Sequence, residues 1–204
     1  MMATSSNYND RPAESPRPFD ANRDGLVVAE GAGTLILEEY KRAKKRGAPI
    51  LGEIEGFWSN GSGMHLTNSD ARSMEECLLA SLKDAGRNPE EIQHVNAHAT
   101  ATSHGDEIEA IVTSKIYGAK VPVTSLKGHL GHTMGACGAI EAIATLLMMR
   151  QGFIASTLNL ETPDPTLPPL KHIMGEPWDR RFRLGVSNNF AFGGVNTSLV
   201  LGLI

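Results

Sequence analysis

Cysteine is scarce in this sequence of 204 residues. Its two cysteines, Cys77 and Cys137, lie far apart, and neither has the spacing of a metal-ligand pair. Both stand in apolar segments of helical character, where a free cysteine usually behaves as a small buried hydrophobic residue. We therefore expect a protein of a reducing compartment, without a disulfide framework.

Basic runs and long apolar stretches are also missing. The chain has 19 Lys and Arg against 23 Asp and Glu, a net charge of -4, which disfavours nucleic acid or an anionic membrane as the main partner. No apolar stretch approaches the roughly 20 residues that cross a bilayer. The first residues lack the basic start and apolar core of a signal peptide. These absences together predict a cytoplasmic location.

The chemistry-bearing residues gather between positions 125 and 149. Lys127, His129 and His132 share a glycine-punctuated loop, which runs into a segment whose only acidic residue is Glu141. As a helix this segment is apolar on every side, which predicts burial. A buried carboxylate costs roughly several kcal/mol unless it is paired, and Lys127 is the nearest cation along the chain.

The place where this helix begins decides what the loop can do. If it begins near Thr133, then Lys127 and His132 lie at its amino end, where free backbone amides favour developing negative charge. Those are the parts of an oxyanion site. The alternative is a glycine-rich loop that caps a core helix, with histidines bonded only to backbone. The combination of one lysine, two histidines and a buried glutamate favours the first interpretation.

The first part of the chain predicts loop, two strands and a helix. Residues 1–24 are polar and proline-bearing, typical of a surface loop or tail. Strands are expected at 26–29 and 34–38, joined through GAG, and a basic helix follows that Gly47 ends. Its KRAKK segment is either a patch for an acidic partner or a solvated helix face, and the second is the more common case.

After residue 50, predicted strands and helices alternate three times, as in a parallel sheet with crossover helices. Strands are expected at 50–58, 92–97, 121–125, 181–186 and 197–203, with a proline-studded surface excursion from 151 to 171. Chemistry in such sheets gathers at the carboxyl ends of the strands. His98 and Lys127 both fall at that edge, so the two histidine-bearing loops are expected to converge.

Two amphipathic helices are predicted between these strands. The first is capped by Asn68 or Ser69 and ended by Gly86, and the second is ended by Gly118. The side chains expected to face inward are Met74, Cys77, Leu78, Leu82 and Ala85 in the first helix, and Ile108, Ile111, Val112 and Ile116 in the second.

Three segments resemble, in order and spacing, motifs of the β-ketoacyl-acyl carrier protein synthases. They are VNAHATATSHGDEIEA, SLKGHLGHTMGACGAIEA and SNNFAFGGVN, and the likeness extends over RPFDANRDGLVVAEGAGTLILEEYKRAKKRG. The resemblance implies an α/β, thiolase-like fold. Residues 49–204 would form its C-terminal half, with a mixed five-stranded sheet and buried and flanking helices. Residues 1–48 would be the tail of the N-terminal half, with its last strands and a short helix.

The resemblance also implies a Cys-His-His site. His98 and His132 match the two histidines, Lys127 matches the lysine that supports the first of them, and Glu141 matches the acidic partner of that lysine. Phe192 matches the phenylalanine whose amide completes the oxyanion hole and whose ring gates the acyl pocket.

Further positions match the binding residues of the family. Thr100 and Thr102 match the threonines that bond the phosphopantetheine arm of the acyl carrier protein, which is a substrate carrier, so no cofactor is expected. A structural monovalent cation is held in some members at the positions of Asn96, Glu141, Ser187 and Asn188.

The chain departs from the family pattern chiefly in its cysteines. The family's nucleophilic cysteine lies in the first half of the fold, and neither Cys77 nor Cys137 matches it. We therefore expect a fragment, or one subunit of a split enzyme, that is inactive alone. Ala99 and Ala101 stand where glycine and serine are commoner. His129 is additional, and is either structural or pocket-lining.

The implied activity is that of an acyltransferase, the decarboxylative Claisen condensation of malonyl-ACP with an acyl thioester in fatty acid or polyketide biosynthesis. The implied partners are acyl carrier protein and the N-terminal half or a second subunit, with a homodimer in the complete enzyme and neither nucleic acid nor membrane. The alternative is a non-catalytic partner subunit that resembles a chain-length factor. The joint presence of His98, Lys127 and His132 favours the enzyme.

Overall fold

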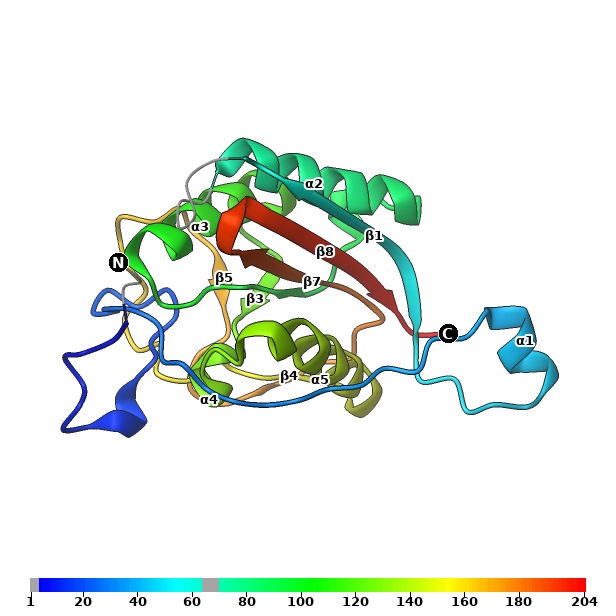
Figure 1. Ribbon diagram of the computed structural model, residues 1–204, viewed down its shortest axis with the longest axis horizontal. Helices are drawn as coiled ribbons and strands as arrows, with labels where there is room; N and C mark the ends of the chain where they lie inside the picture. The colour runs from blue at the N-terminus through cyan, green and yellow to red at the C-terminus, as the bar shows by residue number, and fades with distance from the viewer. Residues whose placement is uncertain (1–3, 64–69) are drawn as a thin grey trace.

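A six-stranded mixed sheet organises the computed structural model, which describes residues 4–63 and 70–204 (Figure 1). The strand order is β1-β8-β7-β2-β3-β5. Strand β2 pairs in parallel with both β3 and β7, and β3 pairs in parallel with β5, whereas β8 runs antiparallel to β1 and β7. The strands are β1 (Glu53–Gly61), β2 (Val95–Asn96), β3 (Pro122–Thr124), β5 (Lys171–His172), β7 (Leu184–Ala191) and β8 (Val195–Gly202).

The sheet has one strand more than the five predicted. The added strand, β5, belongs to the excursion that was expected to be irregular. It has two residues, Lys171 and His172, and joins the sheet through backbone pairing with β3, which requires no side-chain pattern in the sequence. A separate two-stranded sheet pairs β4 (Phe153–Ile154) with β6 (Trp178–Asp179).

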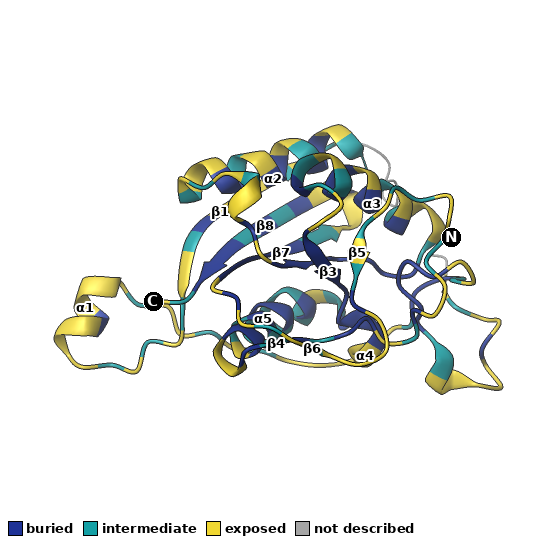
Figure 2. Ribbon diagram, turned by 180° about the vertical axis from the view of Figure 1, so that it is seen from behind, coloured by how far each residue is buried: buried dark blue, intermediate teal, exposed yellow. Residues whose placement is uncertain are grey.

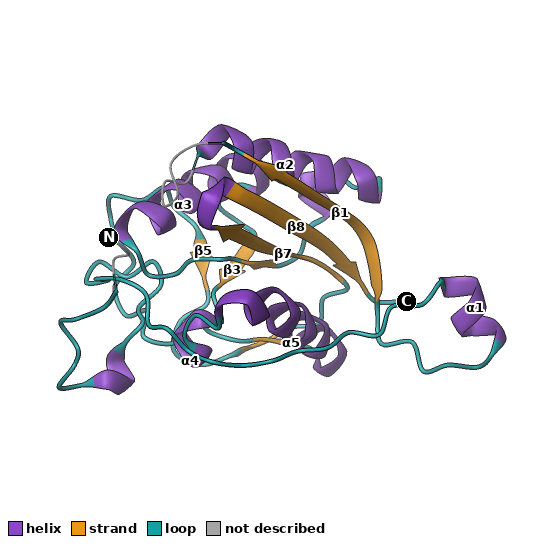
Figure 3. Cartoon of the chain, viewed as in Figure 1, coloured by secondary structure: helices purple, strands orange, loops and turns teal. Residues whose placement is uncertain are grey.

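Helices cover both faces of the sheet (Figure 3). On one face, α2 (Ala71–Ala85) lies against β1 and β8 and beside α3 (Ser103–Tyr117). On the other face, α5 (Cys137–Gln151) lies against β7 and β8, preceded by the short helix α4 (Lys127–Leu130). Each face therefore has its own hydrophobic cluster. One contains Val95, Val123 and Val186, and the other contains Met148 of α5 together with Ile154 and Phe182.

Helix α2 follows the prediction closely. Met74, Cys77, Leu78 and Leu82 are buried, Ala85 is partly buried, and Gly86 ends the helix with a φ of 64°. The predicted caps Asn68 and Ser69 lie outside the described residues. The N-cap is Asp70, whose carboxylate accepts a hydrogen bond from the Ser73 amide, so that one of the free amides of the first turn is satisfied.

Helix α3 is rotated relative to the prediction. Ile111 is 40% exposed, and Ile108 and Ile116 are only partly buried. The fully buried positions include Asp106 and Glu109, one helical turn apart. Those carboxylates face inward because they bind backbone amides of the preceding loop, described below, and this outweighs the burial of an isoleucine. The predicted apolar stripe at 108, 111, 112 and 116 was therefore wrong at 111.

The two strands predicted at 26–29 and 34–38 do not form. Residues 25–39, here called the strap, are extended but make only isolated bridges, at Leu26 and Val28. Ile36 is 90% exposed and Leu37 is 71% exposed, because among the described residues no strand lies beside them to pair with. The basic helix α1 (Tyr40–Lys45) does follow and lies away from the body of the molecule (Figure 1).

The N-terminal loop is also more buried than expected for a surface tail. Phe19 and Asp20 are fully buried. The Asp20 carboxylate accepts hydrogen bonds from the Glu161 and Thr162 amides, each at 2.9 Å, and pairs with Arg17 at 3.3 Å. Residues 17–24 are therefore held against the loop that follows β4.

Helix α5 is shorter and less enclosed than predicted. It begins at Cys137 after a 3-10 turn, η3 (Met134–Ala136), and only one side of it is fully buried, while Leu147 on another side is 44% exposed (Figure 2). The sheet covers the buried side. The strap crosses part of the opposite side, where a Cβ at Gly33 would lie 3.1 Å from the Ala139 Cβ. Among the described helices, none combines the length and apolar character needed to span a membrane.

Candidate active site

The two histidines predicted to converge do meet. His98 follows the carboxyl end of β2, and His132 lies in the loop between α4 and α5. Their ring centroids are 5.2 Å apart and the rings are nearly perpendicular, at 83°. Both residues are buried. The parallel pairing of β2 with β3 explains the convergence, since both loops leave the same edge of the sheet.

A buried ion pair lies beneath these rings. Lys127 Nζ is 2.6 Å from Glu141 Oε1, and the two side chains are 1% and 2% exposed. The other carboxylate oxygen of Glu141 accepts long hydrogen bonds, each of 3.4 Å, from the side-chain amides of Asn96 and Asn189. Burial raises the pKa of Glu141, and the adjacent Lys127 opposes that shift. The pairing argued from the sequence is therefore present in the fold.

Both imidazoles are neutral near pH 7. Burial lowers the pKa of His98 well below its usual value, and the positive charge of Lys127 and the neighbouring His132 lower it further. Burial, assisted by Lys127, lowers the pKa of His132 to about 4. The Met134 amide donates to His132 Nδ1 at 3.2 Å, which makes Nδ1 an acceptor and leaves the ring proton on Nε2. A neutral histidine of this kind can donate one hydrogen bond without being a permanent acid.

Two carboxylates of α3 hold the loop that carries His98. Glu109 accepts the His98 amide at 2.8 Å with one oxygen and the Ala99 amide at 2.6 Å with the other. Asp106 accepts the Ala101 amide at 3.0 Å, at a residue whose φ is 65°. Burial raises the pKa of Glu109 to about 8 and that of Asp106 to about 6, while the backbone amides that donate to them favour the charged carboxylates and oppose this shift. Sequence reasoning missed these residues, although GDEIEA places two acids one turn apart on a predicted helix.

The same aspartate joins the loop to the N-terminal segment. Its second oxygen accepts the Phe19 amide at 2.7 Å, and Arg23 Nε lies 3.9 Å from it. Arg23 also pairs with Asp164 at 2.6 Å. Asp106 therefore serves two backbone amides from segments that are far apart in the chain.

His132 is held by the strap. Its amide donates to the Val27 carbonyl at 2.7 Å, and its carbonyl accepts the Ala29 amide at 3.0 Å. The preceding Gly131 has a φ of 68°, and a Cβ there would lie 2.8 Å from the Ala29 Cβ. The close passage of the strap thus requires glycine at this position.

The other predicted residues are distributed around this centre. Thr100 Oγ1 and Thr102 Oγ1 are 3.0 Å apart, so the two hydroxyls share one hydrogen bond. Phe192 lies in the turn η4 (Phe192–Gly194) and is 44% exposed. The aromatic ring that contacts His98 is instead that of Phe190, at 6.0 Å, which the sequence did not single out. The role of Phe192 stays a prediction.

His129 makes a structural contact. Its Nε2 lies 2.8 Å from the Ser156 carbonyl oxygen, which ties α4 to the segment after β4. Of the two alternatives left open for this residue, the structural one is favoured by that bond.

Of the four side chains expected around a monovalent cation, three lie together, because Asn96 Nδ2 also donates to Glu141 Oε2 at 3.4 Å. Asn96 donates to Ser187 Oγ at 3.2 Å and its own Oδ1 is buried without a partner in the described chain, which suits a cation ligand. Asn188, however, follows Ser187 directly on β7, so its side chain points to the opposite face of the sheet, where its Oδ1 accepts a hydrogen bond from Ser198 Oγ at 2.8 Å. The Asn188 side chain therefore lies apart from the other three, and the cation site stays a prediction. Within the described residues no three His, Cys, Asp or Glu side chains form a metal cluster.

Neither cysteine is placed as a nucleophile. Burial raises the pKa of Cys77 to about 11 and also raises that of Cys137, whereas a nucleophilic cysteine requires access to its thiolate. Cys77 donates to the Trp58 carbonyl at 3.5 Å, and Cys137 donates to Asn189 Oδ1 at 2.9 Å. Both are free thiols.

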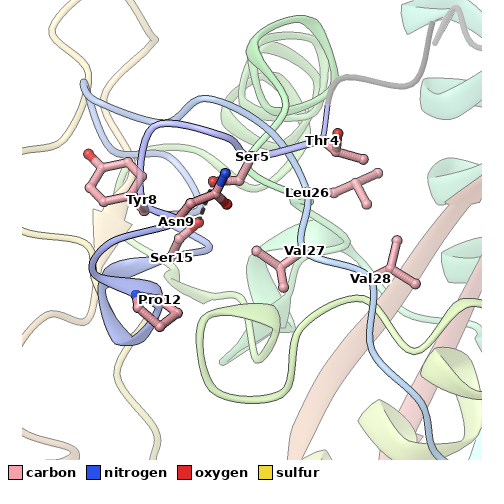
Figure 4. Close-up of a pocket in the computed structure, with 9 residues that line it drawn as sticks. All are labelled: Thr4, Ser5, Tyr8, Asn9, Pro12, Ser15, Leu26, Val27 and Val28. Carbon is pink, nitrogen blue, oxygen red and sulfur yellow. Dashed lines mark hydrogen bonds between the residues drawn. The ribbon is translucent and has the colours of Figure 1, made fainter.

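A pocket of about 320 Å³ lies between the N-terminal loop and the strap (Figure 4). Thr4, Ser5 and Tyr8 line one side, and Val27 and Val28 line the other. Val27 is also the residue whose carbonyl accepts the His132 amide, so the pocket adjoins the site through the backbone. None of the side chains predicted to act in catalysis lines it.

Comparison with known proteins identifies the family. Residues 51–161 match the family described as Beta-ketoacyl synthase, C-terminal domain. The mitochondrial 3-oxoacyl-[acyl-carrier-protein] synthase of Arabidopsis thaliana is 38% identical over 211 residues, covering 99% of this chain and 45% of the relative. 3-Oxoacyl-[acyl-carrier-protein] synthase 2 of Coxiella burnetii is 39% identical over 204 residues, covering 98% of this chain and 49% of the relative. The chain thus spans about half the length of these relatives.

Solved structures agree on the thiolase-like fold. A beta-ketoacyl synthase from Burkholderia phymatum superposes with a TM-score of 0.96 at 49% identity, over 99% of this chain and 49% of that one. The ishigamide ketosynthase/chain length factor superposes with a TM-score of 0.92 at 33% identity, over 99% and 49%. A type II polyketide ketosynthase in complex with its acyl-carrier protein gives 0.92 at 31% identity, over 99% and 50%.

Proposed function

Because the chain belongs to the β-ketoacyl synthase family, as its C-terminal half, we propose that it supplies the two-histidine half of a 3-oxoacyl-[acyl-carrier-protein] synthase. The observation that carries the proposal is the meeting of two neutral imidazoles, those of His98 and His132, whose ring centroids are 5.2 Å apart, with the buried Lys127–Glu141 pair nearby. Two aligned donors of this kind match a reaction in which negative charge develops on one oxygen.

The proposed chemistry begins with loss of CO₂ from a malonyl thioester. The breaking C–C bond leaves its electron pair as an enolate whose charge lies on the thioester oxygen. Hydrogen bonds from the two imidazoles stabilise that oxygen, and removal of one such donor typically slows a reaction by about 10²- to 10³-fold. The enolate carbon then attacks an acyl group carried on a cysteine, a new C–C bond forms, and the cysteine thiolate leaves.

In this proposal the remaining residues support the two imidazoles and bind the substrate. Burial lowers the pKa of both imidazoles, and the charge of Lys127, which is paired with Glu141, lowers it further and so helps to keep them neutral. The hydroxyls of Thr100 and Thr102 bond the phosphopantetheine arm, and Phe192 gates the acyl pocket and provides an amide for the oxyanion. No cofactor is used, and no step depends on the cation.

We assign the nucleophilic cysteine to a polypeptide segment outside these 204 residues. The raised pKa values and buried positions of Cys77 and Cys137 support this assignment. The proposed partners are that N-terminal half, a second copy in a homodimer of the complete enzyme, and acyl carrier protein, for which the ketosynthase solved in complex with its carrier protein is a precedent. The cytoplasm is the proposed location.

The test reconstitutes this chain with a polypeptide that carries the N-terminal half and follows release of labelled CO₂ from malonyl-ACP. We expect His98→Ala and His132→Ala to lower the rate by about 10²- to 10³-fold each. His129→Ala is the matched control, since it removes a third histidine of the same region that bonds only the Ser156 carbonyl. Absence of CO₂ release by the unaltered assembly, or equal rates for all three variants, contradicts the proposal.

A second candidate is a non-catalytic subunit that acts beside an active synthase, supported by the similarity to a ketosynthase/chain length factor pair. In that case His98→Ala leaves condensation by the assembly unchanged. Product chain length then shifts with substitutions in this chain although its histidines are dispensable.

A further inference from the structure

Arg23 is a buried arginine of the N-terminal loop that reaches two other segments of the chain. Its side chain is 6% exposed. One terminal nitrogen, Nη1, donates to Asp164 Oδ2 at 2.6 Å, and the other, Nη2, donates to the Ser103 carbonyl at 3.2 Å. Nη1 also donates to the Asp20 carbonyl at 3.0 Å within its own loop. The guanidinium therefore ties the N-terminal loop both to the segment after β4 and to the start of α3.

The start of α3 is where the two predicted substrate-binding threonines lie. Thr102 is the N-cap of α3, but within the described chain its hydroxyl makes no capping bond and instead shares a hydrogen bond with Thr100 Oγ1 at 3.0 Å. A Cβ at Gly105, in the first turn, would collide with Thr102 Oγ1, so this hydroxyl lies directly against that turn. The place where α3 begins therefore sets the position of the threonine pair.

Two groups of the first turn of α3 face Arg23. The Ser103 carbonyl accepts its hydrogen bond, and the Asp106 carboxylate, which binds a backbone amide of the loop that carries His98, lies 3.9 Å from its Nε. The histidine end of the same loop is held separately, by the two oxygens of Glu109. Loss of Arg23 should therefore displace the threonines more than the imidazole.

A second buried arginine of the N-terminal loop allows a direct comparison. Arg17 is 4% exposed and pairs with Asp20 at 3.3 Å and with Glu161 at 2.9 Å, so it too ties this loop to the segment after β4. Its remaining hydrogen bond goes to the Glu14 carbonyl within the loop. Among the described residues, none of its hydrogen-bond or ion-pair partners belongs to α3 or to the loop that carries His98. Both arginines anchor the N-terminal loop, and of the two only Arg23 reaches α3.

We propose that Arg23 is a positioning residue for substrate binding, which holds the Thr100 and Thr102 hydroxyls in place for the phosphopantetheine arm through the first turn of α3. The inference rests on the proposed function, which assigns that arm to the two threonines. Arg23 acts through Ser103 and Asp106 rather than on the substrate. Its loss should therefore weaken binding of the carrier-linked substrate and leave the chemical step nearly unchanged, so that KM rises while kcat is retained.

The kinetic experiment compares Arg23→Gln with Arg17→Gln in the reconstituted assembly, with malonyl-ACP as substrate. We expect Arg23→Gln to raise KM about fivefold with kcat nearly unchanged, the factor for one lost hydrogen bond between the arm and a hydroxyl. Arg17→Gln should leave both constants nearly unchanged, although it removes the ion pair with the buried Asp20. In a Thr102→Val background, Arg23→Gln should raise KM much less, because one of the groups that it positions is gone. Equal changes of KM in the two arginine variants, or additive effects of Arg23→Gln and Thr102→Val, overturn the proposal.

A spectroscopic readout needs no turnover. In the chain labelled with ¹³C at the threonine methyl groups, the Thr102 signal, identified by its loss in Thr102→Val, should shift in Arg23→Gln and stay in place in Arg17→Gln. An unshifted signal in Arg23→Gln, or equal shifts in both variants, overturns the positioning role even if the assembly is active. Absence of CO₂ release by the unaltered assembly contradicts the proposed function and does not alter these signals, so the two failures are distinguishable.

A second variant covers the case in which Arg23→Gln does not fold. Arg23→Lys keeps a positive charge beside Asp164 but lacks the planar pair of terminal nitrogens that reaches Asp164 and the Ser103 carbonyl together. It should therefore fold and still shift the Thr102 signal. An unshifted Thr102 signal in folded Arg23→Lys overturns the proposal in that case.

Discussion

The His98 loop and the strap differ in how the rest of the chain holds them. The His98 loop is fixed from inside, because two buried carboxylates of α3 bind its amides at 2.6–3.0 Å. The strap runs extended past α5 without joining a sheet, and its apolar residues Ile36 and Leu37 face outward. The loop is thus held by groups within the described residues, whereas the strap has exposed apolar side chains.

The largest expected effect comes from the charged centre that the His98 loop overlies. Glu141→Ala leaves the Lys127 ammonium buried without its partner, which should lower the free energy of unfolding by about 3–5 kcal/mol. Urea denaturation of the chain measures it. The control is Glu75→Ala, which breaks an equally short but exposed pair with Lys115 and should cost under about 1 kcal/mol. Similar losses of unfolding free energy in both variants would mean that breaking the buried ion pair costs no more than breaking the exposed one.

The next largest effect is expected when the hydrogen bonds that hold the His98 loop are weakened. In Glu109→Gln, one carboxylate oxygen becomes an NH₂ group that faces the amide of His98 or Ala99, donor against donor. We expect a loss of about 1–3 kcal/mol in the free energy of unfolding and slower decarboxylation in the assembly. Glu107→Gln, exposed on the same helix, is the control. If the two variants are equally stable, the loop is held by something other than this carboxylate.

A third prediction concerns pH and the buried His94. This ring bonds Thr124 at 2.8 Å, is fully buried, and has a pKa lowered by burial to about 3. Its unfolded form binds a proton below about pH 6.5, so its stabilising contribution is complete above that pH and is lost as pH falls toward 3. Denaturation midpoints at pH 7, 6 and 5 should therefore decline more steeply for the unaltered chain than for His94→Gln.

When the free energy of unfolding is plotted against pH, the slopes for the unaltered chain and for His94→Gln should differ by at most about 1.4 kcal/mol per pH unit. His104→Gln removes an exposed histidine of α3 and should leave the slope unchanged. The comparison between variants is needed because the raised pKa values of Asp106, about 6, and Glu109, about 8, act in the opposite direction as pH rises. Parallel curves for all three proteins would refute the contribution of His94.

The smallest effect on the isolated chain should come from the strap. Ile36→Ser and Leu37→Ser remove side chains that are 90% and 71% exposed, so the free energy of unfolding should change by less than about 0.5 kcal/mol. Affinity for the N-terminal half, measured by calorimetry, should fall clearly. Met174→Ser, at an exposed apolar position after β5, should leave that affinity unchanged. Loss of stability without loss of affinity would mean that the strap serves this chain only.

The His98 loop and the strap also differ in how well the sequence predicts them. The loops that carry His98 and Lys127 were predictable because parallel strands end at one edge, and the Glu141 partner followed from a single charge in an apolar helix. The role of Glu109 was not predictable, since the sequence does not distinguish a glutamate that binds backbone amides from any other glutamate in a helix. The strap was predicted as strands from Leu35, Ile36 and Leu37, yet strand pairing depends on a neighbour that the local pattern cannot specify.

The two backbone bonds between the strap and His132 connect this histidine to an extended segment with exposed apolar side chains. The loop of the first imidazole, that of His98, is fixed by carboxylates of α3. The second is anchored to Val27 and Ala29, on a segment whose outer apolar side chains are still free to bind. Under the proposed function, a polypeptide that binds the strap would therefore contact the same segment that holds His132.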